Sequence, residues 1–403
     1  MRILQLNCVY GNGSTGKLVE INSRILRQSG HEVLTCYGNP PDINDGSSKR
    51  ICSKSEHLFN CVYSRVVGIP FGGIFLSNSR IYKEIKSFKP DVVHVHCVNG
   101  QSLNIYNLLK YLGRNDIKTV VTLHAEFFHT GSCTHACECE KWKTECHDCS
   151  IYKYETASLL FNRANKAWKL MRDAFASFKP ENIIITAVSP WLAERAAQSA
   201  ILKNFRIEYV PNGVNTNLFH LSEPLHTAPF NNGKKTVLFV TPYFTLTKHL
   251  KGGYFIPEIA KRLPGYNFLV VASASDNNFE GMPENVHYFG RAKNQEELAR
   301  LYSSADLTLI LSVRETFSMV TAESLCCGTP VVGFKAGGPE SIALPDYSTF
   351  VEYGNLDALE TAINDSLKKA HDKTAISEAG IEKFSEFNMA HGFEDIYKST
   401  LIK

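Results

Sequence analysis

The sequence lacks long apolar runs. No stretch of about 18 consecutive apolar residues occurs in the chain, so we expect no transmembrane helix. The N-terminal segment MRILQLNCVYGNG has only a short apolar stretch before Gly and Asn and shows no small-residue cleavage site, which is not typical of a signal peptide. These absences favour a cytoplasmic protein.

An excess of charge of one sign is also missing. The chain has 403 residues and a net charge of +3, which argues neither for nor against a nucleic-acid partner, and we expect none. Apolar residues make up 44% and charged residues 21%, as in ordinary globular proteins. The length is sufficient for two or three domains, each with its own core.

The first glycine loop lacks a residue that a nucleotide-binding P-loop needs. Residues 11–18 read GNGSTGKL, and Leu18 stands where Ser or Thr would bind magnesium. We therefore interpret Lys17 as ordinary helix surface. The glycines still permit a tight turn from strand to helix that points backbone N–H groups at a ligand. A turn with no ligand is the alternative.

Short apolar strands alternate with helical patterns along most of the chain. The predicted strands are RILQLNCVY, HEVLTCYG, DVVHVHCV, KTVVTLHA, NIIITAVS, FRIEYVPNG, KTVLFVTPY, YNFLVVAS, NVHYFG, DLTLILS and TPVVGF. This repetition predicts parallel sheets with helices on both faces. We expect an α/β fold of two doubly wound, Rossmann-like domains facing a central cleft, with ligands at the carboxyl ends of the strands. The predicted domains are 1–188 and 189–385, followed by a helix at 386–403 that crosses back to the first domain.

Two acidic residues flank a helix start in the second half. Glu315 follows the strand DLTLILS, and Glu323 lies eight residues later, with TFSMV between them. Carboxylates bind sugar hydroxyls through paired hydrogen bonds, and a helix N-terminus binds phosphate. This combination indicates a nucleotide sugar.

At this point the chain resembles the retaining GT-B glycosyltransferases of family 4. The resemblance rests on the Glu-x7-Glu spacing, CGTPVV, GGPES and PNGVNTNLF, in the family's order. It implies that Glu323 holds the donor ribose, that Glu315 contacts the donor sugar and that Lys251 neutralises the diphosphate. It also implies main-chain contacts to sugar and phosphate from Phe317, Ser318, Met319 and Val320. The sequence has no Asp-x-Asp motif to hold magnesium, so we expect no catalytic metal. The expected donor is a UDP- or GDP-sugar.

One position departs from the family pattern. Family members usually carry Arg a few residues before the lysine, whereas this chain has Thr241 and Pro242 there. We predict that Lys248 supplies the second positive charge.

The first half contributes three further predictions that rest on the same resemblance. His124, after the strand KTVVTLHA, matches a histidine that contacts the donor sugar, and we count it with Glu315 and Lys251 as catalytic. Glu126 is predicted on the acceptor side. The glycine loop Gly13, Ser14, Thr15 and Gly16 is predicted to line the cleft. His94 and His96 share one strand, and we expect at most one of them to face the cleft.

The twelve cysteines fall into two groups. Seven are scattered, and we expect most of these to be reduced core residues. The other five crowd into an insert at 131–150, where Cys133, Cys139, Cys146 and Cys149 have the spacing of a structural zinc site. Cys137 would be spare, and His135 or His147 are alternative ligands. Disulfides or free thiols are the alternatives to zinc. The segment CEKWKT with its paired cysteines resembles bacterial capsule and exopolysaccharide glycosyltransferases of the colanic-acid type.

Two segments bear on membrane contact. Residues 66–76 are apolar and rich in glycine but too short to span a bilayer. Residues 157–175 carry basic residues at helical spacing, which is the pattern of a basic amphipathic helix lying on anionic lipid at the inner face of a membrane. The simpler alternative is a helix with one solvated face. We expect a glycosyltransferase that acts on a glycan or lipid-linked acceptor. The alternatives are a zinc-bearing scaffold without activity, or another GT-B enzyme of nucleotide sugars.

Overall fold

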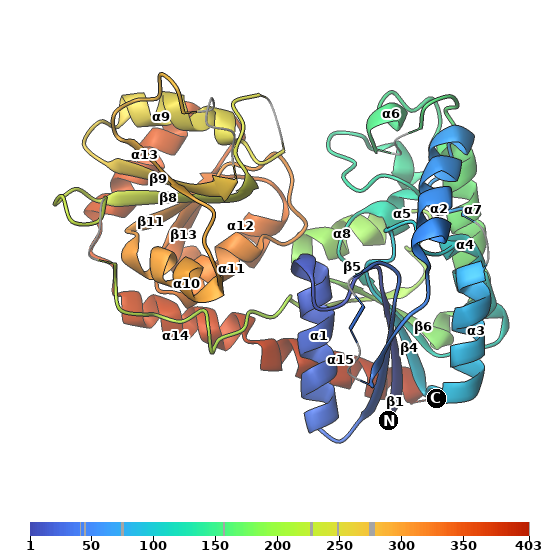
Figure 1. Cartoon of the computed structure of the whole chain (residues 1–403). Helices are drawn as coiled ribbons and strands as arrows, with labels where there is room; N and C mark the ends of the chain where they lie inside the picture. The colour runs from blue at the N-terminus through green and yellow to red at the C-terminus, as the bar shows by residue number, and fades with distance from the viewer. Residues whose placement is uncertain are drawn as a thin grey trace. The chain divides into compact units, whose positions relative to one another are not determined.

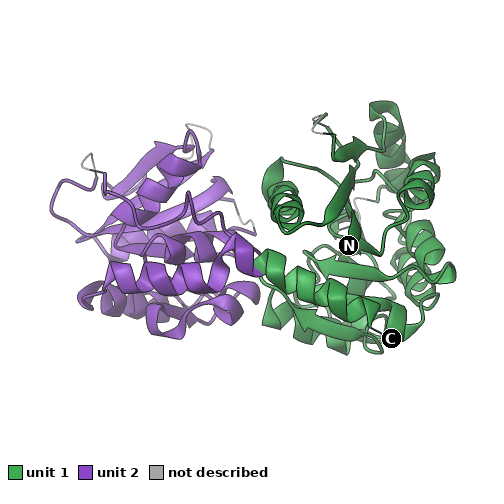
Figure 2. Cartoon of the chain, turned by 90° about the horizontal axis from the view of Figure 1, so that it is seen from below, with its two compact units in different colours: residues 1–211, 389–403 green, residues 212–388 purple. Residues whose placement is uncertain are grey.

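The chain folds into two compact units. The computed structural model describes residues 1–40, 42–43, 46–73, 76–155, 158–225, 229–247, 250–273 and 279–402. Unit 1 comprises Met1–Pro211 and Met389–Lys403, and unit 2 comprises Asn212–Asn388 (Figure 2).

Unit 1 is built on a seven-stranded parallel sheet in the order β3-β2-β1-β4-β5-β6-β7 (Figure 1). Its strands are β1 Arg2–Asn7, β2 Glu32–Tyr37, β3 Ser48–Arg50, β4 Val92–Val95, β5 Thr119–Leu123, β6 Ile183–Ala187 and β7 Arg206–Tyr209. Its helices are α1 Gly13–Gln28, α2 Lys54–Val67, α3 Leu76–Phe88, α4 Ile105–Arg114, α5 Phe127–Thr130, α6 Tyr152–Glu155, α7 Ala164–Phe175 and α8 Pro190–Gln198.

Unit 2 has a six-stranded parallel sheet in the order β10-β9-β8-β11-β12-β13. Its strands are β8 Thr236–Tyr243, β9 Asn267–Ser273, β10 Val286–Gly290, β11 Leu307–Ile310, β12 Val331–Phe334 and β13 Ser348–Val351. Its helices are α9 Ile256–Arg262, α10 Gln295–Ser304, α11 Met319–Cys326, α12 Gly338–Ile342, α13 Leu356–Lys368 and α14 Lys373–Phe384.

The central strands explain why the sequence forms these sheets. Every residue of β4, β5 and β6 is buried, and these strands are rich in Val, Ile and Thr. Such β-branched runs are typical of parallel strands with helices on both faces. The last helix, α15 Glu386–Leu401, adds Met389, Phe393 and Tyr397 to the core of unit 1, where they pack with residues of the sheet.

The structure confirms the predicted α/β fold with two parallel sheets, and each predicted strand is present. The sequence missed β3 and β13, which are short edge strands without a buried apolar run. We predicted the change of domain after residue 188, whereas the compact units change after Pro211. The difference arises because β7 pairs with β6 and so extends the first sheet.

The structure places no membrane-spanning helix in the described part of the chain, where none is both long and apolar enough to cross a bilayer.

Candidate active site

The carboxyl ends of β8, β11 and β12 carry the predicted donor residues of unit 2. These three strands are neighbours in the sheet, so the loops that follow them lie along one edge. Lys251 follows β8, Glu315 follows β11, and the segment Gly337–Gly338 follows β12.

The structure brings Lys251 and Glu315 together. Lys251 Nζ lies 2.5 Å from Glu315 Oε1, and Ser312 Oγ donates to the same oxygen at 2.8 Å. The Lys251 side chain is 36% exposed and the Glu315 side chain 17%, so both remain within reach of a ligand. The pair holds a carboxylate and an ammonium group in a fixed, partly solvated position.

The backbone of Glu315 is fixed by the loop after β12. Glu315 N–H donates to Ala336 O at 3.0 Å, and Gly338 N–H donates to Glu315 O at 2.8 Å. A Cβ atom on Gly338 would lie 2.5 Å from the backbone nitrogen of Phe317, so only glycine fits there. Glu340 accepts from the amides of Ala336 and Gly337. The GGPES motif therefore positions Glu315.

The N-terminus of α11 lies between the two predicted carboxylates. Ser318 caps this helix, accepting from Thr321 N–H at 3.3 Å. Its φ of 84° and ψ of 86° are a strained conformation for a residue other than glycine. Phe317 is buried and packs edge-on against Phe384, which leaves only its main chain for a ligand. The first amides of a helix have no acceptor inside the helix, so this turn suits a phosphate.

Glu323 lies on α11 and is held by one buried partner. Tyr302, from α10, donates its hydroxyl to Glu323 Oε2 at 3.1 Å. Burial and the negative charge of Glu323 raise the pKa of Tyr302, so the phenol stays protonated as a donor. Glu323 itself is only partly buried. No pattern in the sequence pointed to Tyr302, because its hydroxyl reaches Glu323 from a separate helix.

Lys248, which we predicted as the second positive charge for a diphosphate, lies outside the described residues. Thr241 is buried and donates its hydroxyl to the carbonyl of Tyr243. Of the two lysines predicted to bind the diphosphate, Lys251 is the one that lies within the described residues.

In unit 1, the carboxyl ends of β1, β4 and β5 lie side by side and carry the predicted residues. His124 follows β5, and its Nε2 lies 3.3 Å from Nδ1 of His96. Burial lowers the pKa of His124 to about 4, so this imidazole is neutral at pH 7. The rings of His94 and His96 are 3.6 Å apart, because residues two apart on a strand share a face. That at most one of them faces the cleft stays a prediction.

The glycine loop begins α1 directly after β1. Asn12 caps the helix by accepting from Gly13 N–H at 2.8 Å. Ser14 is exposed, Thr15 is half-buried, and Gly16 packs so closely on Val9 that a Cβ atom would lie 3.0 Å from its side chain. Lys17 points to solvent, as expected for helix surface.

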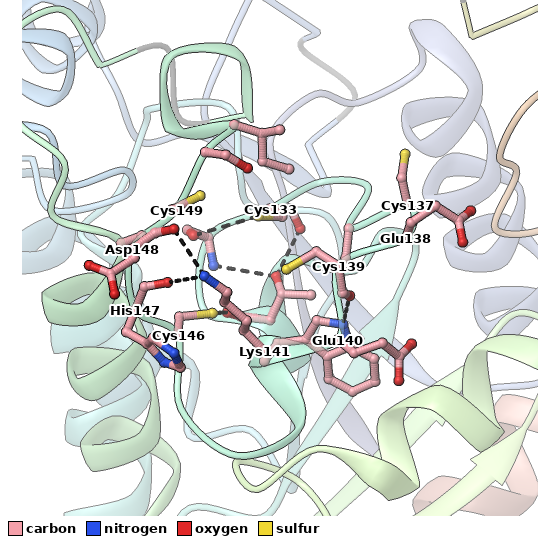
Figure 3. A pocket seen from close by; sticks show the side chains of 17 residues that line it. Cys133, Cys137, Glu138, Cys139, Glu140, Lys141, Cys146, His147, Asp148 and Cys149 are labelled. Atoms are coloured by element: carbon pink, nitrogen blue, oxygen red, sulfur yellow. Dashed lines mark hydrogen bonds between the residues drawn. The ribbon is translucent and has the colours of Figure 1, made fainter.

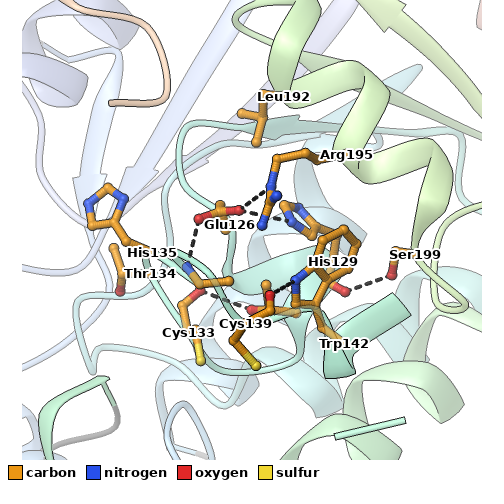
Figure 4. A network of polar contacts seen from close by, with 12 residues as sticks. Glu126, His129, Cys133, Thr134, His135, Cys139, Trp142, Leu192, Arg195 and Ser199 are labelled. Carbon is orange, nitrogen blue, oxygen red and sulfur yellow. Dashed lines mark hydrogen bonds and ion pairs between the residues drawn. The ribbon is translucent and has the colours of Figure 1, made fainter. Parts of the chain in front are cut away.

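Glu126 lies in the interior of unit 1, where its carboxylate is held by its own chain (Figure 4). Arg195 Nε donates to it at 2.7 Å, Ala136 N–H donates at 2.7 Å, and His129 Nε2 lies 3.4 Å away. Burial alone would raise the pKa of Glu126, but contacts with His129 and Arg195 outweigh it and lower the pKa to about 2. This burial argues against the predicted acceptor contact.

The same contacts anchor the cysteine-rich insert. The Arg195 guanidinium stacks over the buried ring of Trp142 at 4.7 Å, and His129 packs edge-on against that ring at 4.8 Å. The sequence did not single out Arg195, His129 or Trp142. Arg195 and Glu126 are 69 residues apart, so no local pattern could reveal the pair.

The insert encloses a cavity of about 490 Å³ lined by all five of its cysteines (Figure 3). Cys133, Cys139, Cys146 and Cys149 surround it, while Cys137 stands apart from them. None of the twelve cysteines, all of which lie in the described part of the chain, forms a disulfide. Burial raises the pKa of Cys146 to about 12 and also raises that of Cys133. Among the described residues, no three His, Cys, Asp or Glu side chains are arranged to hold a metal ion.

Comparison with known families finds one match in each half of the chain. Residues 23–218 match the family described as Glycosyltransferase Family 4, and residues 278–383 match Glycosyl transferases group 1.

Two kinds of relative cover part of the chain. D-inositol 3-phosphate glycosyltransferase of Segniliparus rotundus is 27% identical over 214 residues, which are 49% of this chain and 47% of that protein. N-acetyl-alpha-D-glucosaminyl L-malate synthase of Bacillus anthracis is 30% identical over 124 residues, 29% of this chain and 32% of the relative. The chain thus spans about half the length, or less, of the curated relatives it matches.

Solved structures agree with the fold over the whole chain. Sucrose-phosphate synthase from Thermosynechococcus elongatus has a TM-score of 0.64 at 17% identity, covering 98% of both chains. HepE from Anabaena, solved with UDP and glucose, has a TM-score of 0.63 at 15% identity, covering 99% of this chain and 100% of its own. The chain therefore has the two-domain GT-B fold of these structures, and its two halves are similar to the Glycosyltransferase Family 4 and Glycosyl transferases group 1 families.

Proposed function

We propose that the protein transfers a sugar from a nucleotide-sugar donor to an acceptor hydroxyl. The observation that carries this proposal is the arrangement in unit 2. The Lys251–Glu315 pair, the N-terminus of α11 and Glu323 follow one another along the edge of a single sheet. A nucleotide sugar offers the matching groups, which are sugar hydroxyls, a diphosphate and a ribose.

Each group of the donor has a partner in this proposal. Glu323 accepts hydrogen bonds from the ribose hydroxyls, while Tyr302 holds the carboxylate in place. The amides at the start of α11, from Phe317 to Val320, receive the diphosphate. Lys251 stabilises the negative charge that grows on the leaving diphosphate, and Glu315 orients both Lys251 and the donor sugar. We assign no metal to this step.

In unit 1, we assign His124 and the loop from Gly13 to Gly16 to contacts with the substrates. A neutral imidazole can donate a hydrogen bond to a sugar hydroxyl without adding charge. The exposed start of α1 offers backbone amides for the same purpose. Glu126 has no part in this assignment.

The proposal also specifies a class of donor and a class of acceptor. HepE has been solved with UDP-glucose, which supports a UDP-sugar as the first donor to test, followed by GDP-sugars. We propose that the acceptor is a glycan or a lipid-linked sugar in surface polysaccharide synthesis, of the capsule or exopolysaccharide kind, and that the reaction retains anomeric configuration at the inner face of the membrane. A small acceptor is the second candidate, because two relatives are named for inositol phosphate and malate.

We also propose a structural zinc ion held by Cys133, Cys139, Cys146 and Cys149. These thiols surround one cavity, which supports the proposal, although they would have to draw closer to coordinate an ion. Metal analysis of the purified protein tests it, since about one zinc per chain is expected for a site of this type. A content far below this would leave four free thiols as the better account.

The transfer proposal is tested by a donor-hydrolysis screen with UDP-, GDP- and ADP-sugars. Hydrolysis of one donor class is expected, and replacing Glu315 with Gln should slow it strongly. NMR of the product would show whether the anomeric configuration is retained. If no donor is bound or cleaved by folded protein, a scaffold without activity becomes the better explanation.

A further inference from the structure

Helix α2 is turned with its apolar side outward. Its buried residues are Glu56, Asn60 and Ser64, all polar. Leu58, Phe59, Val62 and Val66 occupy the opposite side and are between 41% and 66% exposed. An ordinary surface helix has the reverse arrangement, with an apolar stripe toward the core.

Specific contacts fix this orientation. The Glu56 carboxylate accepts from the backbone and hydroxyl of Ser77 at 2.6 and 2.5 Å, and from Arg80 at 2.7 Å. Asn60 donates to Gln101 O at 3.1 Å. A buried carboxylate is stable only when it is paired and hydrogen-bonded, and rotating the helix would break these contacts. The apolar side therefore stays outside.

A neighbouring segment extends the exposed apolar surface. Leu159, Leu160 and Phe161 are between 45% and 65% exposed. Leu159 N–H donates to Arg65 O at 2.8 Å, which joins the segment to the end of α2. We name the seven apolar residues on these two elements the α2 patch: Leu58, Phe59, Val62, Val66, Leu159, Leu160 and Phe161.

The charges beside the α2 patch are positive. Lys54 and Arg65 are exposed on α2, and Arg163 stacks over Phe161 at 4.6 Å. The only carboxylate within α2 is Glu56, which is buried and paired with Arg80. Residues 158–163 contain no acidic residue. An apolar surface bordered by cations matches the interface of a bilayer that contains anionic lipid.

We propose that the α2 patch binds an anionic bilayer surface, with α2 lying in the interface. The sequence predicted this role for residues 157–175, but the apolar side of α7 is buried, including Trp168, Met171 and Phe175. The protein surface that contacts the bilayer therefore consists of α2 and the residues that precede α7. The proposal goes beyond sugar transfer and does not depend on it.

Vesicle flotation of the full chain tests the proposal. Vesicles of phosphatidylcholine alone are compared with vesicles that contain phosphatidylglycerol. The protein should float with the anionic vesicles and much less with the neutral ones. The double variant Phe59→Ser, Val62→Ser should reduce binding by about tenfold or more, because it removes two side chains from the interface. Phe387→Ser is the matched control, since Phe387 is 43% exposed in unit 2, outside the α2 patch.

The melting temperature of each variant and its donor hydrolysis are measured alongside. Both should match those of the wild type, since the altered side chains are exposed. Equal binding of wild type and double variant would overturn the proposal, as would absence of wild-type binding to anionic vesicles. A wild-type dimer that the double variant dissociates, without vesicle binding, would show that a second copy covers the patch instead. Because flotation needs no turnover, its failure would count against membrane contact but not against the proposed sugar transfer, which donor hydrolysis tests separately.

Discussion

Unit 1 and unit 2 each hold a carboxylate that follows a strand and pairs with a cation, yet the two pairs differ in nature. Glu315 pairs with Lys251 at 2.5 Å, and both side chains stay partly exposed. Glu126 pairs with Arg195 at 2.7 Å and is fully buried. The carboxylate of Glu315 can accept hydrogen bonds from a ligand, whereas the carboxylate of Glu126 already accepts hydrogen bonds from its own chain. A glutamate after a strand can therefore serve as a binding group or as an anchor for the fold.

Removing the charge of Glu126 should have the largest effect. Glu126→Gln removes the buried counter-ion of Arg195 and leaves it only the exposed Glu140, 3.7 Å away. Breaking a buried pair costs about 3–5 kcal/mol of unfolding free energy. Chemical denaturation of the full chain, followed through the unfolding of unit 1, measures the loss. Glu194→Gln, an exposed neighbour on α8, should stay within about 0.5 kcal/mol of wild type. A Glu126 variant as stable as wild type would contradict the anchoring role.

Acid should weaken the same anchor. The pKa of Glu126 is lowered from 4.5 to about 2 in the folded protein, so its stabilising effect is complete above pH 4.5 and is lost as pH falls toward 2. The loss should amount to at most about 3 kcal/mol. It is measured as the difference in unfolding free energy between wild type and Glu126→Gln, in which the contributions of titrating groups that do not contact Glu126 cancel. A difference that stays constant across this range would rule out the charged pair.

Glu315→Gln should act on turnover and leave stability nearly unchanged. The amide keeps the shape but loses the charge that orients Lys251, and we expect donor turnover to fall by about 100-fold, or about 2.7 kcal/mol. Steady-state kinetics on the best donor measures this, with the melting temperature as control. Normal turnover in Glu315→Gln would contradict the assignment of Glu315 to the donor site.

The smallest effect is expected at Lys17. This lysine would be essential in a P-loop, but it lies exposed on α1. Lys17→Ala should therefore leave donor turnover within about twofold of wild type, since exposed substitutions away from a site change little. A large loss would reopen the question of a phosphate contact at the start of α1.

The sequence predicted the sheets because buried parallel strands are short, nearly continuous apolar runs. It also predicted the order of Glu315, the helix start and Glu323, since these lie within one strand–loop–helix unit. It could not reveal the contact of Lys251 with Glu315 or of Tyr302 with Glu323, which join distant segments. The burial of Glu126 was missed for the same reason, because its partner Arg195 comes from α8.

The outward apolar face of α2 shows another limit. The helix alternates polar and apolar residues with helical spacing, and that pattern alone does not say which side faces the core. Ser77 and Arg80 on α3 determine which side of α2 faces the core, because they bind Glu56.

The most direct test of the donor site is a calorimetric titration of UDP, GDP and ADP into wild type and Glu323→Ala. One of the three nucleotides should bind to wild type, and Glu323→Ala should weaken it by about tenfold or more, because a charge-assisted hydrogen bond to the ribose is lost. Glu378→Ala, an exposed glutamate on α14, serves as the matched control and should bind like wild type. Equal affinity of wild type and Glu323→Ala would contradict the assignment of the nucleotide to unit 2.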